Sequence, residues 1–231
     1  MDKKVNEINR FIKGYGDLIT KKLIPQKLNG SFSVKNRKVY KLVPIIGTIM
    51  QSKEEKVMEL FFESPTREWH FEEIVNGAKI ARSKADRWLK QFIKEGLIKR
   101  KKKRGKMPYY ISSYDFPKYK NRKRIFGLTK LYESGFLNHL GSLEKAKTII
   151  LFGSFSRSDW YKNSDLDIFI YGDPKGLRIV DYELKLHRDI QLFICQNKKG
   201  LSKLGEGLIR NIIKGDLIKG DMDFVRVGVN A

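Results

Sequence analysis

The sequence predicts an α+β protein in which a helical, strongly basic part precedes a part built on a small mixed β-sheet. Between residues 51 and 112, three helical patterns are followed by two short strand patterns around a run of lysine and arginine. From residue 147 onward, apolar strand patterns dominate, and an amphipathic helix pattern follows them. Such a change along the chain is typical of two domains of different architecture. With 231 residues, the chain is long enough for both.

The composition favours a polyanionic partner. The chain has 48 lysines and arginines against 26 aspartates and glutamates, a formal net charge of +22. We place nucleic acid ahead of an anionic membrane because no basic amphipathic helix stands apart from a folded context. No apolar run suits a membrane span or a secretory signal, so we expect a cytoplasmic protein without a membrane partner. The single cysteine, Cys195, excludes an intrachain disulfide and is expected to be buried.

Residues 51–112 predict three helices and a hairpin. The first helix begins at Ser52, and Glu55 stands three residues later, where a capping box requires it. The second helix is expected at about 71–78. The third is expected at about 82–95, where apolar residues recur at helical spacing. Two strand patterns then flank a tip that is almost entirely basic.

This order of elements resembles the winged-helix family of DNA-binding domains. The resemblance implies that the third helix enters a major groove and that the hairpin tip forms a wing against the phosphates, most simply of double-stranded DNA. A charge run is usually a solvated surface, but here it lies between two strands and can neutralise several phosphates. The candidate nucleic-acid-binding residues are Ser83, Lys84, Arg87, Gln91, Arg100, Lys101, Lys102, Lys103, Arg104 and Lys106.

The remaining divisions of the chain follow from composition and pattern. Residues 1–50 form an N-terminal extension of unknown role. Residues 113–146 predict a helical linker that includes a second basic run, at 118–124. Residues 147–231 form the second domain, in which we expect a helix at 201–214.

Three strands are expected in the second domain. The first ends at Phe152, directly before Gly153 and Ser154. The second carries Asp165 and Asp167, and ten residues (155–164) separate it from the Gly-Ser pair. Because residues i and i+2 of a strand point to the same face, the two aspartates can hold a divalent cation together. Carboxylate ligands favour Mg²⁺, or Mn²⁺ in its place.

The Gly-Ser pair and the Asp-x-Asp pair at this spacing resemble the motif of the polymerase-β-like nucleotidyltransferases. The resemblance covers about residues 145–195. It implies transfer of a nucleoside monophosphate from an NTP to a hydroxyl acceptor, with Asp165 and Asp167 as catalytic metal ligands. It also implies that the triphosphate contacts a set of small and basic residues. These nucleotide-binding candidates are Gly153, Ser154, Arg157 and Ser164.

Members of this family commonly carry a third carboxylate on a neighbouring strand, where it helps to activate the acceptor hydroxyl. The third expected strand, Asp189–Cys195, offers Asp189, whereas the usual apolar-acid-apolar pattern falls on Gln191. We assign Asp189 as the third catalytic residue and keep Gln191 as the alternative occupant of that place. A glutamine there would weaken general-base activation.

The sequence is therefore compatible with two functions. The first is a metal-dependent nucleotidyltransferase with a nucleic-acid-binding module. The alternative is a DNA-binding transcriptional regulator or antitoxin-like protein, whose second domain binds nucleotide or a toxin partner with little turnover. The sequence does not identify the acceptor, which can be a protein hydroxyl, a nucleic-acid end or a small molecule. His70, His139 and His187 lack the spacing of a zinc site.

Overall fold

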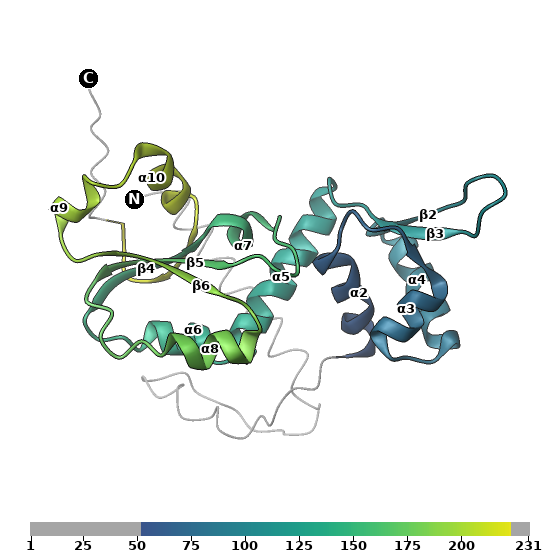
Figure 1. Ribbon diagram of the computed structural model, residues 1–231, viewed down its shortest axis with the longest axis horizontal. Coiled ribbons are helices and arrows are strands. Elements are labelled where there is room, and N and C mark those ends of the chain that lie inside the picture. Colours follow the sequence, from purple (N-terminus) through teal and green to yellow (C-terminus); the bar gives the residue numbers. More distant parts are fainter. Residues whose placement is uncertain (1–51, 223–231) are drawn as a thin grey trace, which may run out of the picture. The chain divides into compact units, whose positions relative to one another are not determined.

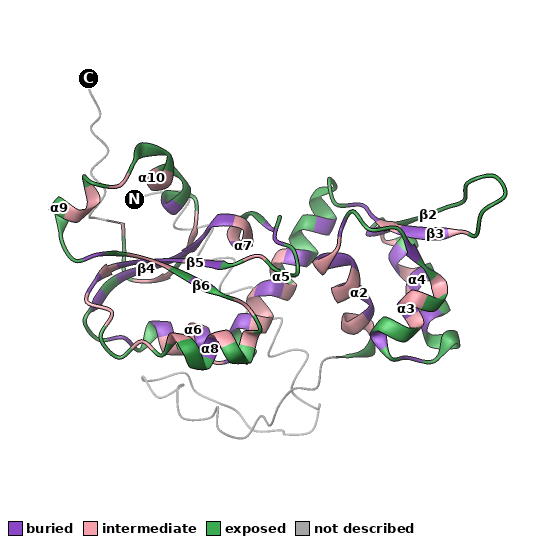
Figure 2. Cartoon of the chain, in the orientation of Figure 1, coloured by how far each residue is buried: buried purple, intermediate pink, exposed green. Residues whose placement is uncertain are grey.

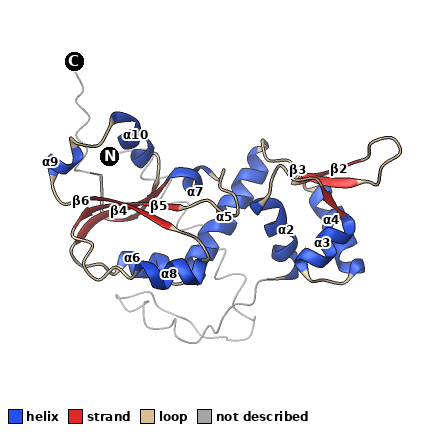
Figure 3. Cartoon of the chain, in the orientation of Figure 1, coloured by secondary structure: helices blue, strands red, loops and turns tan. Residues whose placement is uncertain are grey.

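The computed structural model describes residues 52–222, and all of them belong to one compact unit (Figure 1). The expected N-terminal extension, 1–50, lies outside the described residues. The fold is α+β, with helices and strands interleaved along the chain (Figure 3). Among the helices of the described part, none combines the length and apolar character that crossing a membrane requires.

The first part of the described chain contains the expected three helices and the hairpin. Its elements are α2 (Lys53–Glu63), β1 (Trp69–His70), α3 (Phe71–Ala78), α4 (Arg82–Lys94), β2 (Ile98–Lys101) and β3 (Tyr109–Ser112). The capping box at the start of α2 is confirmed, since the Glu55 amide donates to Ser52 Oγ at 3.1 Å and the Ser52 amide to Glu55 Oε2 at 2.9 Å. The two-residue strand β1 was not expected, and it extends the hairpin to an antiparallel sheet of order β1-β3-β2.

Two helices, α5 (Pro117–Glu133) and α6 (Phe136–Gly141), occupy the expected helical region 113–146. The start of α5 packs on α2, where the buried Tyr119 hydroxyl donates to the Phe61 carbonyl at 2.7 Å. Further along α5, Lys123 donates to the carbonyl of Trp160. Helix α5 therefore contacts both the first helix and the segment that leads to the second sheet.

The second sheet is mixed, as expected, with the order β6-β5-β4-β7. Strands β5 and β6 are parallel, and the other pairs are antiparallel. Its elements are β4 (Ala146–Phe152), α7 (Gly153–Arg157), β5 (Leu166–Gly172), α8 (Ile179–Leu186), β6 (Ile190–Cys195), α9 (Lys198–Leu201), α10 (Glu206–Ile213) and β7 (Asp216–Lys219). The single helix expected at 201–214 is wrong, because Gly205 takes an extended conformation and α10 begins only after it.

The central strands β4 and β5 are largely buried (Figure 2). Alternate residues of the sheet face two different apolar layers. On one face, Ile168 packs in the large core that also includes residues of α6 and α8. On the other, Phe169 packs with Phe152, Ile212 of α10 and Cys195, whose expected burial is confirmed. Since side chains alternate along a strand, Asp167 lies on the Phe169 face. Asp167 thus belongs to the face on which α10 packs.

Candidate active site

Gly153 brings the backbone directly against a carboxylate. It stands directly after β4, as the first residue of α7, with a φ of +71°, and a Cβ placed on it would lie 1.9 Å from Asp167 Oδ2. Strand register explains the approach, since Phe152 on β4 pairs with Asp167 on β5. Only glycine combines this φ with this closeness. The structure therefore brings together the Gly-Ser turn and the Asp-x-Asp strand that the sequence singled out.

The short helix α7 begins at Gly153, and an aromatic contact connects it to the loop that follows. The rings of Phe155 and Trp160 stack with centroids 5.1 Å apart. Ser158, at a φ of +63°, ends the helix. Ser154 is partly exposed, and its hydroxyl makes no hydrogen bond to another described residue. This hydroxyl is thus available to a ligand.

The two aspartates of the motif differ in environment. Asp165 is exposed and stands directly before β5, whereas Asp167 is partly buried within it. Burial raises the pKa of Asp167, the negative charge of Asp165 raises it further, and Arg157 opposes the shift. A cation between the carboxylates would remove the cost of ionising both.

A magnesium ion fits this donor set. Within residues 52–222, no group of three or more histidine, cysteine or acidic side chains is arranged to hold a metal. Asp165 and Asp167 could hold such an ion, with water and phosphate oxygens as its remaining ligands. Mg²⁺ characteristically binds in this way at phosphoryl-transfer sites, whereas Zn²⁺ prefers three or four protein ligands.

The two candidates for the third catalytic position are placed differently, since Gln191 lies on the neighbouring strand β6 and Asp189 directly precedes it. Gln191 is in register with Asp167, and Ile190 with Leu166. Asp189 therefore lies beside Asp165, and its carbonyl accepts a hydrogen bond from the Leu166 amide at 2.9 Å.

Asp165 and Asp189 also line the same hollow, of about 490 Å³, at the start of β5 and β6. Its other wall is the exposed apolar side of α8, where Val180 and Leu184 lie. The carboxylate of Asp189, directly before β6, thus stands at the rim of the site, and Gln191 on β6 stands next to Asp167.

Sequence analysis missed Arg188. Its Nη1 donates to the carbonyls of Tyr161 and Ser164, at 2.7 and 2.9 Å. The side chain is only 9% exposed, and Nη2 lies 3.9 Å from Glu63 Oε1 at the end of α2. Burial lowers the pKa of this guanidinium, which still stays protonated at neutral pH. Its place directly before Asp189 is the only signal in the sequence that could have drawn attention to it.

The segment that Arg188 holds is the loop leading into Asp165. A second bond fixes it from outside, because the Lys162 amide donates to the Glu63 carbonyl at 3.0 Å. Within it, Ser164 Oγ accepts the Tyr161 amide at 2.8 Å, so this hydroxyl shapes the loop. Arg157, the other flanking candidate, is exposed, and its Nε lies 3.0 Å from Asp159 Oδ2.

The candidate nucleic-acid-binding residues lie on two exposed surfaces. On α4, Ser83, Lys84 and Arg87 are exposed, whereas Gln91 is partly buried and donates to Glu95 Oε1 at 2.8 Å. At the hairpin tip, every candidate from Arg100 to Lys106 is exposed. One of them is engaged within the protein, since Lys103 Nζ lies 2.8 Å from Glu68 Oε1.

Comparison with known proteins supports the domain that this geometry indicates. Residues 134–205 match the nucleotidyltransferase domain family. The matched segment begins just before α6 and contains Gly153, both motif aspartates and Asp189. Searches of curated proteins and of solved structures gave no match. The match supports a nucleotidyltransferase-type enzyme.

Proposed function

We propose that the protein transfers a nucleoside monophosphate from an NTP to a hydroxyl acceptor in a metal-dependent reaction. The observation that carries the proposal is the contact of Gly153 with Asp167, beside Asp165, inside the segment that matches the nucleotidyltransferase family. Asp165 and Asp167 would hold Mg²⁺ or Mn²⁺. The ion would neutralise charge on the phosphates during displacement.

The remaining residues divide between the two substrates. Gly153 leaves room for the triphosphate, and the unbonded hydroxyl of Ser154 can donate to a phosphate oxygen. Arg157 would add a charge-assisted contact, and Ser164 would keep the loop before Asp165 in shape. On the acceptor side, Asp189 would accept the proton of the attacking hydroxyl. The acceptor oxygen then bonds to the α-phosphorus, the bond to the bridging oxygen breaks, and pyrophosphate leaves.

We further propose that residues 51–112 act as a winged-helix module that binds double-stranded DNA. Helix α4 presents Ser83, Lys84 and Arg87 to solvent, and the hairpin tip presents an exposed row of cations. In this assignment α4 contacts base edges and phosphates in the major groove, and the hairpin tip contacts the DNA backbone. Gln91 would have to leave Glu95 before it could contact a base. The helices of 113–146 would connect this module to the transferase domain, proposed at 147–231.

One observation favours the alternative, a DNA-binding regulator or antitoxin-like protein with little turnover. The position in register with Asp167 holds Gln191, which cannot act as a base. In that case the second domain would bind nucleotide, or a toxin partner, and DNA binding would carry the function.

A turnover assay separates the two functions. Radiolabelled NTPs with Mg²⁺ would be incubated with the protein alone and with DNA, RNA or cell extract, and compared with Asp165→Ala/Asp167→Ala. Metal-dependent label transfer that is lost in the double variant would establish the transferase, and the labelled species would identify the acceptor. Nucleotide binding without transfer would favour the regulator. If the folded protein shows no nucleotide binding and no transfer, the proposal of a nucleotidyltransferase is refuted.

A further inference from the structure

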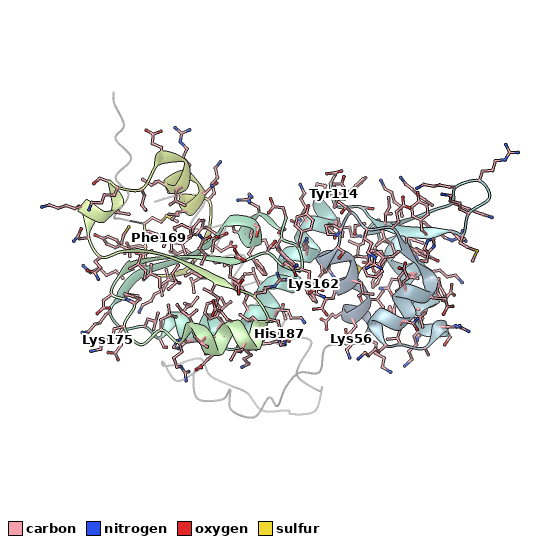
Figure 4. The ribbon with its side chains drawn as sticks, in the orientation of Figure 1. Lys56, Tyr114, Lys162, Phe169, Lys175 and His187 are labelled. Atoms are coloured by element: carbon pink, nitrogen blue, oxygen red, sulfur yellow. The ribbon has the colours of Figure 1, made fainter. Side chains whose placement is uncertain are left out.

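A short turn between β3 and α5 exposes two aromatic rings that the proposed function does not use. Tyr114 is 46% exposed and Phe116 is 53% exposed, and only Asp115 separates them. Tyr114 is labelled in Figure 4, where the turn meets the start of α5. Single exposed aromatic residues are common, but two in one turn are an unusual exposure of apolar surface.

The backbone of this turn is fixed at both ends. The buried Ser113 donates from its amide to the Leu97 carbonyl at 2.9 Å, and the Phe116 amide donates back to Ser113 at 2.9 Å. Phe116 is also the N-cap residue of α5, and its carbonyl accepts the Lys120 amide at 3.1 Å. Tyr119, buried at 1% exposure, anchors that first helical turn on α2. The rings thus project from a rigid frame.

One lysine lies over a ring of the turn, and two more lysines follow in the sequence. Lys99 Nζ lies 5.2 Å from the centre of the Phe116 ring, and Lys118 and Lys120 are exposed on the first turns of α5. None of these three lysines forms an ion pair with a carboxylate in residues 52–222. The only acidic residue between positions 97 and 124 is Asp115, against twelve basic ones. The turn therefore offers π-faces within a strongly positive surface.

We propose that this turn binds single-stranded nucleic acid, with bases stacked on Tyr114 and Phe116 and phosphates on Lys99, Lys118 and Lys120. Every base has a π-face, so stacking on exposed rings is tolerant of sequence, and nearby lysines retain the backbone. A duplex keeps its bases stacked on one another and cannot use the rings in this way. The site is therefore distinct from the duplex-binding surface proposed on α4 and the hairpin tip.

The first experiment compares single- and double-stranded probes by fluorescence anisotropy. The probes are labelled oligo(dT) and oligo(rU) of about 12 nucleotides, within the usual range of such sites, and a mixed-sequence duplex. We expect Tyr114→Ala/Phe116→Ala to weaken binding of the single strands by at least about tenfold, as loss of stacked bases does, and to leave duplex binding unchanged. Tyr132→Ala is the matched control, since Tyr132 is also 46% exposed and lies at the far end of α5.

Two more variants keep the test decisive if the double alanine variant does not fold. Phe116→Tyr retains a stacking ring and should bind single strands as the parent does. Lys118→Ala/Lys120→Ala should lower affinity for single strands and flatten its dependence on salt, because fewer counterions are released. A photo-crosslink from 5-iodouridine in the oligo(rU) probe should map to Tyr114 or Phe116.

Three results would overturn the proposal. They are unchanged single-strand affinity in the folded double alanine variant, equal losses for strand and duplex, and a crosslink that maps elsewhere. A change in oligomeric mass in the double alanine variant, with single-strand affinity retained, would instead assign the rings to a protein contact. The outcome is independent of the transferase assay, because Asp165→Ala/Asp167→Ala should bind the single-stranded probes normally.

Discussion

Asp167 on β5 is in register with Gln191 on the parallel strand β6. Side chains in register on adjacent strands lie on the same face, so the amide occupies the place nearest to the inner carboxylate of the motif. Asp189, two residues earlier, lies beside Asp165 at the rim and shares its hollow. In the proposed reaction, Asp189 is therefore the carboxylate that would receive the proton of the acceptor hydroxyl.

Asp189→Asn tests the base at the rim. We expect kcat to fall about 100-fold, the effect of removing a positioned general base, while affinity for Mg²⁺-NTP changes little. Turnover over a range of pH and NTP binding by calorimetry measure the two effects. Asp181→Asn on α8, also exposed, is the control. Full activity in Asp189→Asn would remove Asp189 from the reaction.

Gln191→Asp tests whether the glutamine at this position limits the affinity of the site for Mg²⁺. A carboxylate next to Asp167 would add a third oxygen ligand, so we expect tighter Mg²⁺ binding than in the parent protein. Gln191→Asn is the control, because it has nearly the shape of the aspartate variant without its charge. Mg²⁺ titrations of nucleotide binding provide the measurement. Equal Mg²⁺ affinity in both variants would show that position 191 does not face the ion.

Gly153→Ala should separate backbone strain from the contact with Asp167. Gly105 has the same φ, +71°, but a Cβ there would meet nothing within 4 Å. Gly105→Ala should therefore cost only the left-handed conformation, about 1 kcal/mol, and retain activity. Gly153→Ala carries that cost and also displaces Asp167, so we expect a larger loss of unfolding free energy and no detectable transfer. Urea unfolding and NTP turnover of both variants check this, and equal behaviour would contradict it.

The candidate site was predictable where its parts are close in sequence. A strand that ends in Gly-Ser and the alternation around Leu166 and Ile168 place Gly153 and both motif aspartates without knowledge of the fold. The capping box at Ser52 is local in the same way. Periodicity over a few residues reports the face of an element, and these features need nothing more.

What the sequence did not predict depends on long-range pairing. The choice between Asp189 and Gln191 turns on the register of β6 against β5, which neither strand's own pattern determines. Arg188 matters because its guanidinium reaches two carbonyls more than twenty residues earlier in the chain. Strand β7 exists as a partner of β4, and four residues carry too little pattern to reveal it.

Arg188 should act as a positioning residue for the metal ligands. Its removal frees two carbonyls of the loop before Asp165, and a displacement of about 1 Å at a catalytic group can cost about 100-fold in rate. We expect Arg188→Ala to lower kcat by about that factor with a smaller change in KM. Arg188→Lys should recover only part of the rate, because a single ammonium can donate to the two carbonyls as Nη1 does but has no second nitrogen to lie near Glu63 Oε1 as Nη2 does.

Arg178→Ala is the matched control for Arg188, since its side chain is 64% exposed and its contact with Asp181 is a surface ion pair. Steady-state kinetics and thermal unfolding of each variant separate positioning from stability. A variant at position 188 that unfolds earlier but keeps kcat in its folded state would assign Arg188 to the fold alone.

Asp167 should make the metal-free protein less stable as pH rises. Its pKa is raised, chiefly by burial, so between the unfolded and folded pKa values the folded state holds a proton that the unfolded state has lost. Stability therefore decreases with pH through that window, and the penalty is fully present above the folded pKa. Asp167→Asn removes the titrating group, so its Tm at neutral pH should exceed that of the parent protein in the presence of a chelator.

With Mg²⁺, the parent protein should have a higher Tm than Asp167→Asn. An ion held by Asp165 and Asp167 binds the folded state and stabilises it by mass action, so the parent protein should gain Tm with Mg²⁺ and Asp167→Asn should gain little. Thermal unfolding between pH 4 and pH 8, with chelator and with Mg²⁺, gives both comparisons. Asp181→Asn, an exposed aspartate on α8 that pairs with Arg178, should respond to Mg²⁺ as the parent does. An equal Mg²⁺ response in the parent and Asp167→Asn would place the ion elsewhere or exclude it from this site.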